Sequence, residues 1–173
     1  MARLPYADPT QPDIAEKAAR IAAERGGSVI NLYKMLLQSP PLADGWRQLL
    51  TAIRQQCLLS ARYRELAIMR IAVLNEADYE FAQHVPFALK EGYTDAQLAA
   101  LKTAGYRDHF DALDLQVIDY TDAMTTTIRV PQAVFDAVKA NFSDREMVEL
   151  TATIAAYNMV SRFLEALQLD HDQ

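Results

Sequence analysis

Helix signals follow one another along almost the whole chain and leave little room for β-strands. Apolar residues recur at intervals of three and four positions, as they do along one face of an α-helix. Only five glycines occur in 173 residues, and 51% of the residues are hydrophobic. The pattern predicts an all-α fold of seven to nine helices. A chain of this length can bury a real core, so we expect residues 1–173 to form a single domain.

Start and stop residues predict where these helices begin and end. Gly26 ends the first helix, and Pro40 ends the second. Ser60 is an N-cap residue, while Thr94 and Ser143 each stand three positions before a glutamine or glutamate, which is the pattern of a capping box. We predict helices at 10–25, 31–38, 42–57, 61–75, 78–91, 95–103, 112–127, 131–141 and 144–169.

Two stretches of the chain resemble each other weakly. The pattern of residues 60–72 is similar to that of residues 143–156, but only the first stretch is followed by a histidine at the position of His84. A duplicated helical hairpin with one surviving site would explain the similarity. Coincidence between two amphipathic helices would explain it equally well.

Charge and hydropathy exclude several classes of partner. The net charge is −6, and there is no long run of basic residues, so we expect binding neither to nucleic acid nor to an anionic membrane. No apolar run approaches the roughly 20 residues of a membrane span. Residues 1–13 contain one arginine and no apolar core. They do not read as a signal peptide, so we expect a cytoplasmic protein.

Cysteine and histidine usage argues against thiol and metal chemistry. Cys57 is the only cysteine, which excludes an internal disulfide and a CxxC pair. We interpret it as a small, partly buried residue. The three histidines, His84, His109 and His171, lie far apart in the sequence and do not have the spacing of a ligand set. The sequence therefore predicts no bound metal.

Three ionisable residues stand on apolar helix faces and are the candidate catalytic groups. Glu65 shares its face with Ile68 and Met69, while His84 lies four positions after Glu80 and therefore on the same face. Burial there would raise the pKa of a glutamate and lower the pKa of a histidine. Both shifts favour proton transfer near neutral pH. An exposed ion pair between Glu80 and His84 is the simpler alternative.

The surrounding segment suggests a binding pocket. Tyr79 and Gln83 form a second pair four positions apart, and Pro86 falls within the same predicted helix. A proline removes a backbone donor and tends to free the carbonyl of Ala82. A kink next to ionisable groups can open a pocket, although the proline can also simply bend the helix.

Residues 59–92, LSARYRELAIMRIAVLNEADYEFAQHVPFALKEG, resemble the carboxymuconolactone decarboxylase and alkylhydroperoxidase D superfamily. Residues 31–50 and 142–169 fit the same resemblance, which extends over about residues 30–168. The resemblance implies an alkylhydroperoxidase-D-like helical bundle that assembles as a homo-oligomer. It also implies that decarboxylase activity needs no bound cofactor.

One branch of that superfamily uses a CxxC pair placed between a glutamate and a histidine. If Glu65 and His84 match these two, the cysteines would fall at Ala77 and Glu80, and both are missing. Thiol peroxidase chemistry needs a thiolate nucleophile. Cys57 lies outside the motif, so alkylhydroperoxidase or peroxiredoxin activity is the disfavoured alternative.

The decarboxylase branch lacks the cysteines and has a glutamate four residues before the histidine, as Glu80 and His84 do. A carboxylate group of its lactone substrate leaves as CO₂, and the electrons left behind form a dienolate that must be protonated on carbon. The resemblance implies that His84 is the acid and that Glu65 and Glu80 orient it or relay the proton. It also implies that Arg62 or Arg64 holds a substrate carboxylate.

These inferences lead to three hypotheses for the function. The first is a cofactor-independent, decarboxylase-like enzyme that acts on a small carboxylated or enolisable substrate, with Tyr79, Gln83 and Arg62 as candidate substrate-binding residues. The second is a hydroperoxide or redox function that does not use cysteine. The third is a non-enzymatic helical binding protein.

The last predicted helix bears on the assembly of the protein. It carries apolar residues on more than one face, namely Met147, Leu150, Ile154, Ala155, Tyr157, Met159, Val160, Phe163, Leu164 and Leu167. Such a helix must be buried by something. A partner subunit would cover the second face of the helix in a homo-oligomer. Alternatively, the helix is the central one of a single bundle.

Overall fold

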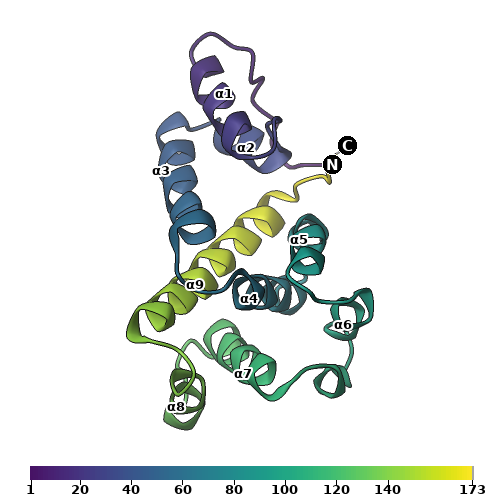
Figure 1. Cartoon of the computed structure of the whole chain (residues 1–173). Helices are drawn as coiled ribbons and strands as arrows, with labels where there is room; N and C mark the ends of the chain where they lie inside the picture. Colours follow the sequence, from purple (N-terminus) through teal and green to yellow (C-terminus); the bar gives the residue numbers. More distant parts are fainter. Residues whose placement is uncertain (173) are drawn as a thin grey trace. The chain divides into compact units, whose positions relative to one another are not determined.

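The computed structural model describes residues 1–172, and all the regular secondary structure in this range is helical (Figure 1). The α-helices are α1 (Ala15–Glu24), α2 (Asn31–Leu36), α3 (Pro40–Thr51), α4 (Ala61–Leu74), α5 (Asp78–Lys90), α6 (Asp95–Ala100), α7 (Ala112–Thr126), α8 (Gln132–Lys139) and α9 (Asp144–Leu167). A π-helical turn, η1 (Ala52–Gln56), and a 3₁₀ turn, η2 (Tyr106–His109), complete the set. The prediction of an all-α fold is confirmed. Within the described residues, no helix is long and apolar enough to cross a membrane.

The chain divides into two compact units. Unit 1 contains residues 1–55 together with the end of the chain from Leu164, and unit 2 contains Gln56–Phe163. Most of α9 therefore belongs to unit 2, while its last residues belong to unit 1. All of the candidate site residues lie in unit 2. That the whole chain is a single domain stays a prediction.

Unit 1 is built around α1, α2 and α3. Its core contains Ile21, Leu36 and Trp46, which are almost completely buried. The two ends of the chain meet here, because the backbone N–H of Arg3 donates to the carbonyl of Leu167 at 2.9 Å. Such a contact fixes terminal segments that would otherwise be poorly ordered.

Several predicted helix bounds in unit 1 are wrong, and the reasons are local. Pro40 begins α3 instead of ending α2, because a proline is well suited to the first helical turn, where its missing N–H has no partner to lose. The helix predicted at 42–57 widens at Ala52 into a π-turn. The first helix begins at Ala15, since Asp8 binds the backbone and side chain of Thr10 and holds the preceding residues in turns.

In unit 2, α4 is the central helix. It packs against α5 and α7, and all eight residues from Glu65 to Ala72 are buried. Ser60 caps α4 by accepting a hydrogen bond from the N–H of Arg62 at 3.3 Å, as predicted. The predicted capping boxes are also present, at Thr94 for α6 and at Ser143 for α9.

A tight turn reverses the chain between α4 and α5. Glu76 has a φ of 54°, and the N–H of Ala77 donates back to the carbonyl of Ala72 at 2.8 Å. Asn75 in this turn donates to Asn158 at 3.1 Å and to Ser161 at 2.6 Å, both on α9. The turn lays α5 alongside α4, and this arrangement positions the candidate site.

Candidate functional site

Glu65 of α4 and His84 of α5 meet inside unit 2. The Nδ1 atom of His84 lies 2.6 Å from Oε2 of Glu65. Both side chains are buried, with exposed fractions of 1% for Glu65 and 6% for His84. Such a pair fixes the orientation of the imidazole, and the carboxylate stabilises the charged form of the ring.

Aromatic rings surround the imidazole. Tyr157 of α9 stands edge-on to His84, with ring centroids 5.1 Å apart and an interplanar angle of 87°. Phe87, one turn further along α5, lies 5.8 Å away. Edge-to-face contacts of this kind are favourable and hold a ring in place. In the sequence, Tyr157 is recognisable only as one of the apolar residues of the last helix, and nothing there indicates a part in the site.

An arginine neighbours the second oxygen of the carboxylate. Nε of Arg64 donates to Oε1 of Glu65 at 3.3 Å, and the Arg64 side chain is only 13% exposed. The two oxygens of Glu65 are thus shared between a guanidinium and an imidazole. A half-buried guanidinium at this place supplies positive charge next to the pair.

The other candidates on α5 differ in their surroundings. Glu80 and Tyr79 are buried, at 2% and 4% exposure, whereas Gln83 is half-buried. Glu80 lies one helical turn before His84 on the same helix. Pro86 lies within α5 without ending it, so the polar residues before it and the end of α5 belong to one continuous helix.

Arg62 is held in a separate polar cluster. Its guanidinium donates to Asp114 of α7 at 2.6 Å and stacks on the ring of Tyr93, 4.1 Å from the centroid. The hydroxyl of Tyr93 donates to the same carboxylate at 2.9 Å. Burial raises the pKa of Asp114, and it raises the pKa of Tyr93 as well. Asp114 and Tyr93 could not be identified from the sequence, because nothing local distinguishes them from other residues near helix ends.

Cys57 lies outside this arrangement, just after the π-turn. Burial, together with the nearby Glu149 carboxylate, raises the pKa of the thiol. A raised pKa lowers the thiolate fraction at neutral pH and with it the nucleophilic reactivity.

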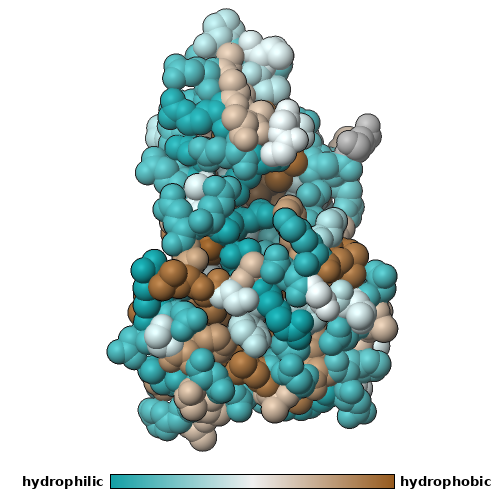
Figure 2. Space-filling view, in the orientation of Figure 1, coloured by the Kyte–Doolittle hydropathy of each residue, from teal (hydrophilic) through white to brown (hydrophobic). Residues whose placement is uncertain are grey.

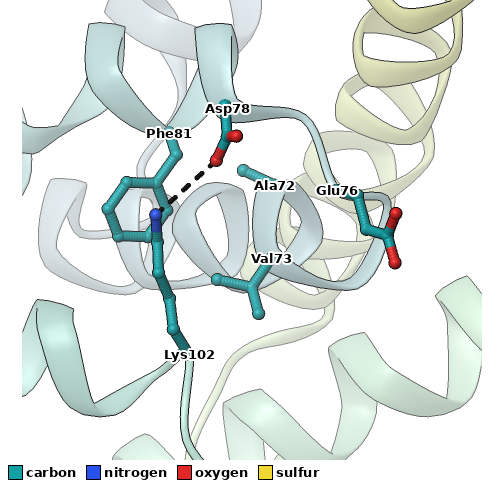
Figure 3. Close-up of a pocket in the computed structure, with 6 residues that line it drawn as sticks. All are labelled: Ala72, Val73, Glu76, Asp78, Phe81 and Lys102. Carbon is teal, nitrogen blue, oxygen red and sulfur yellow. Dashed lines mark ion pairs between the residues drawn. The ribbon is translucent and has the colours of Figure 1, made fainter.

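Unit 2 also has a surface pocket beside the start of α5 (Figure 3). Its volume is about 360 Å³, and it is lined by Ala72, Val73, Glu76, Asp78, Phe81 and Lys102. The ammonium of Lys102 reaches over Phe81, 4.0 Å from the ring centroid, and lies 3.6 Å from Asp78. His84, Glu65 and Glu80 are not among its lining residues. Across residues 1–172, no group of three or more His, Cys, Asp or Glu side chains could hold a metal ion.

Comparison with known proteins agrees with the helical architecture. The profile described as the carboxymuconolactone decarboxylase family matches residues 40–122, a range that includes Glu65, Glu80 and His84. No curated protein matches the sequence.

Several solved structures share the fold at low sequence identity. An uncharacterised peroxidase-related protein from Silicibacter sp. TM1040 superposes with a TM-score of 0.83 and 20% identity, covering 99% of this chain and 92% of that one. A structure from Ralstonia eutropha JMP134, described as an alkylhydroperoxidase AhpD core, has the same TM-score, 15% identity and coverage of 99% and 93%. A debrominase crystallised with 2,3,4-tribromopyrrole has a TM-score of 0.77, 15% identity and coverage of 99% and 94%.

Proposed function

Because this chain belongs to the carboxymuconolactone decarboxylase and alkylhydroperoxidase D superfamily, we propose that it is a cofactor-independent, decarboxylase-like enzyme. It would act by proton transfer on a small carboxylated or enolisable substrate. The contact between Glu65 and His84 carries this proposal, since a buried carboxylate–imidazole pair is suited to general acid–base chemistry.

The proposed chemistry assigns one role to each side of the imidazole. Nδ1 faces Glu65, so Nε2 is the atom that would deliver a proton to the carbon of a dienolate or enolate. Glu65 would hold the ring and stabilise its charged form before the transfer. Decarboxylation releases CO₂ and consumes one proton, which solvent must replace. Glu80, one turn away, would pass that proton to the ring after each turnover.

The substrate carboxylate needs a cation, and the contacts favour Arg64 over Arg62. Arg64 already contacts Glu65, whereas Arg62 is bound to Asp114 and Tyr93 and would have to leave both. We therefore propose Arg64 as the carboxylate-binding residue. Tyr79 and Gln83 remain candidate substrate-binding residues. A protein that binds a small carboxylate without turning it over would use the same groups.

The raised pKa of Cys57 supports ranking thiol peroxidase activity below proton transfer.

We also propose that the protein works in the cytoplasm as a homo-oligomer. Its long α9 helix supports the second of these statements, because Val148 and Met159 expose apolar surface.

The test is proton exchange on a panel of small β-keto acids and carboxylated lactones, followed by NMR in deuterated water. Wild-type protein should accelerate decarboxylation or exchange on at least one of them. His84→Ala should reduce the rate by about 10²- to 10⁴-fold, the usual contribution of a general acid or base, while the helical circular dichroism remains. Full activity in His84→Ala would exclude the proposed role.

A further inference from the structure

We propose that the surface pocket beside the start of α5 binds a small zwitterion, namely a free amino acid with an apolar side chain. The pocket belongs wholly to unit 2, and its lining residues come from α4, the turn after α4, α5 and the chain just after α6. We call it the turn pocket. The proposed catalytic residues are not among those that line it, so this inference is independent of the proton-transfer chemistry.

The first support is the size and the apolar surface of the turn pocket. Its volume of about 360 Å³ falls within the range of about 300 to 1,000 Å³ that is typical of small-molecule sites. Ala72 is buried, while Val73 and Phe81 are half-buried and offer apolar surface to a ligand. On the face shown in Figure 2, hydrophobic side chains likewise reach the surface in patches bordered by hydrophilic ones. The turn pocket differs in being hollowed and lined by charges of both signs.

The second support is the arrangement of these charges. The ammonium of Lys102 lies over the ring of Phe81, 4.0 Å from its centroid, and 3.6 Å from the carboxylate of Asp78. Glu76 is exposed and stands on the far side of Val73 from Lys102 in Figure 3. The turn pocket therefore presents one ammonium and two carboxylates, which complement the carboxylate and the ammonium of an amino acid.

The ion pair between Lys102 and Asp78 leaves room for a ligand. The two side chains are 48% and 84% exposed, and exposed pairs of this kind contribute little to stability. An ammonium has three donors, so Lys102 can bind a ligand carboxylate while it remains beside Asp78. The ammonium of the ligand would then lie between the carboxylates of Asp78 and Glu76.

The third support is the backbone of Glu76. Its φ of 54° lies in the left-handed region, which glycine adopts without strain and which glutamate rarely adopts. A glutamate at this position therefore costs stability that a glycine would not cost. Strained residues of this kind cluster at functional sites. A carboxylate that binds a ligand accounts for the presence of glutamate in this turn.

Three related compounds test the proposal when they are titrated into isotope-labelled protein and followed by NMR. They are leucine, isoamylamine, which is leucine without its carboxylate, and isocaproate, which is leucine without its ammonium. Leucine should shift the amide signals of Val73, Glu76 and Lys102, with a Kd of about 1 mM or lower. Each analogue should bind about fivefold more weakly, because it lacks one exposed ion pair.

Two substitutions should affect the three compounds in opposite patterns. Lys102→Met keeps an apolar stem but removes the ammonium, so it should weaken leucine and isocaproate about fivefold without weakening isoamylamine. Glu76→Gly should weaken leucine and isoamylamine without weakening isocaproate. Since glycine adopts a positive φ without strain, Glu76→Gly should not lower the midpoint of urea unfolding. Its loss of binding would therefore not reflect a loss of folding.

Lys90→Met is the matched control for the lost positive charge. Lys90 is exposed at the end of α5, about 18 Å along the helix from Asp78, and its loss should leave leucine binding unchanged. His84→Ala should also bind leucine as wild type does, which separates failure of this proposal from failure of the proton-transfer proposal. Absence of leucine-induced shifts at the turn pocket, an analogue that binds as tightly as leucine, or wild-type leucine binding by Lys102→Met would each overturn the proposal.

Discussion

His84 and Glu65 are in direct contact, with 2.6 Å between Nδ1 and Oε2, although nineteen positions separate them in the sequence. One residue comes from α5 and the other from α4, so the contact depends on the packing of these two helices. Its burial makes it the strongest candidate for chemistry in unit 2.

Glu65→Gln should impair catalysis more than it impairs folding. The amide keeps the shape of the side chain but loses the charge that stabilises a protonated ring, so kcat should fall by roughly 10²-fold. The strongly hydrogen-bonded Nδ1 proton of His84, which should resonate far downfield in wild-type NMR spectra, should disappear as well. If kcat stays normal while that signal is lost, the pair is structural.

Arg70→Ala should destabilise the fold. Arg70 binds both oxygens of Asp122, at 2.6 and 2.7 Å, and its side chain is only 10% exposed. Asp122 is 27% exposed, so removing the guanidinium leaves a partly desolvated carboxylate without its partner, and the free energy of unfolding should drop by about 2 kcal/mol. Urea denaturation measures this value.

The matched control for Arg70 is Arg107→Ala. Arg107 pairs with Asp119, but both side chains are well exposed, at 48% and 40%. Its loss should change the free energy of unfolding by less than about 1 kcal/mol. An equal loss of unfolding free energy in the two variants would show that the Arg70–Asp122 pair contributes no more than an exposed ion pair.

Ser143→Ala should lower stability in a pH-dependent way. The Glu146 carboxylate completes the capping box by accepting hydrogen bonds from the N–H and the hydroxyl of Ser143. These hydrogen bonds lower the pKa of Glu146. A folded-state pKa below the unfolded value stabilises the protein above the unfolded pKa, and the contribution is lost as the pH falls through the folded value.

The loss in Ser143→Ala should therefore be about 1 kcal/mol at pH 7, typical of an N-cap. It should shrink when unfolding is measured in acid, below the lowered pKa of Glu146. A loss that stays constant from neutral to acid pH would mean that Glu146 contributes nothing through its charge.

Cys57→Ser should leave activity within about twofold of wild type. The raised pKa keeps the thiol protonated at neutral pH, so it is a poor nucleophile. Wild-type protein should accordingly react slowly with a thiol reagent at pH 7 and faster as the pH rises. A sulfenic acid trapped at Cys57 by low peroxide, together with activity lost in Cys57→Ser, would favour the peroxidase alternative.

The sequence by itself determined the helices and their caps. Ser60, Thr94 and Ser143 act on backbone groups two or three positions away, so their effect is visible in the local pattern. The placement of Glu80 and His84 on one helix face is equally local, because it follows from their spacing. Where the local signal was ambiguous, as at Pro40, the prediction was wrong.

Only the tertiary structure decided which distant groups meet. The turn at Glu76 and the packing of α5 on α4 bring Glu65 into contact with His84. The packing of α7 on α4 likewise brings Asp114 within hydrogen-bond distance of Arg62. Spacing along one helix cannot encode these choices, because each depends on the register between two helices. That register is set by the fit of whole buried faces, to which a single residue contributes only a small part.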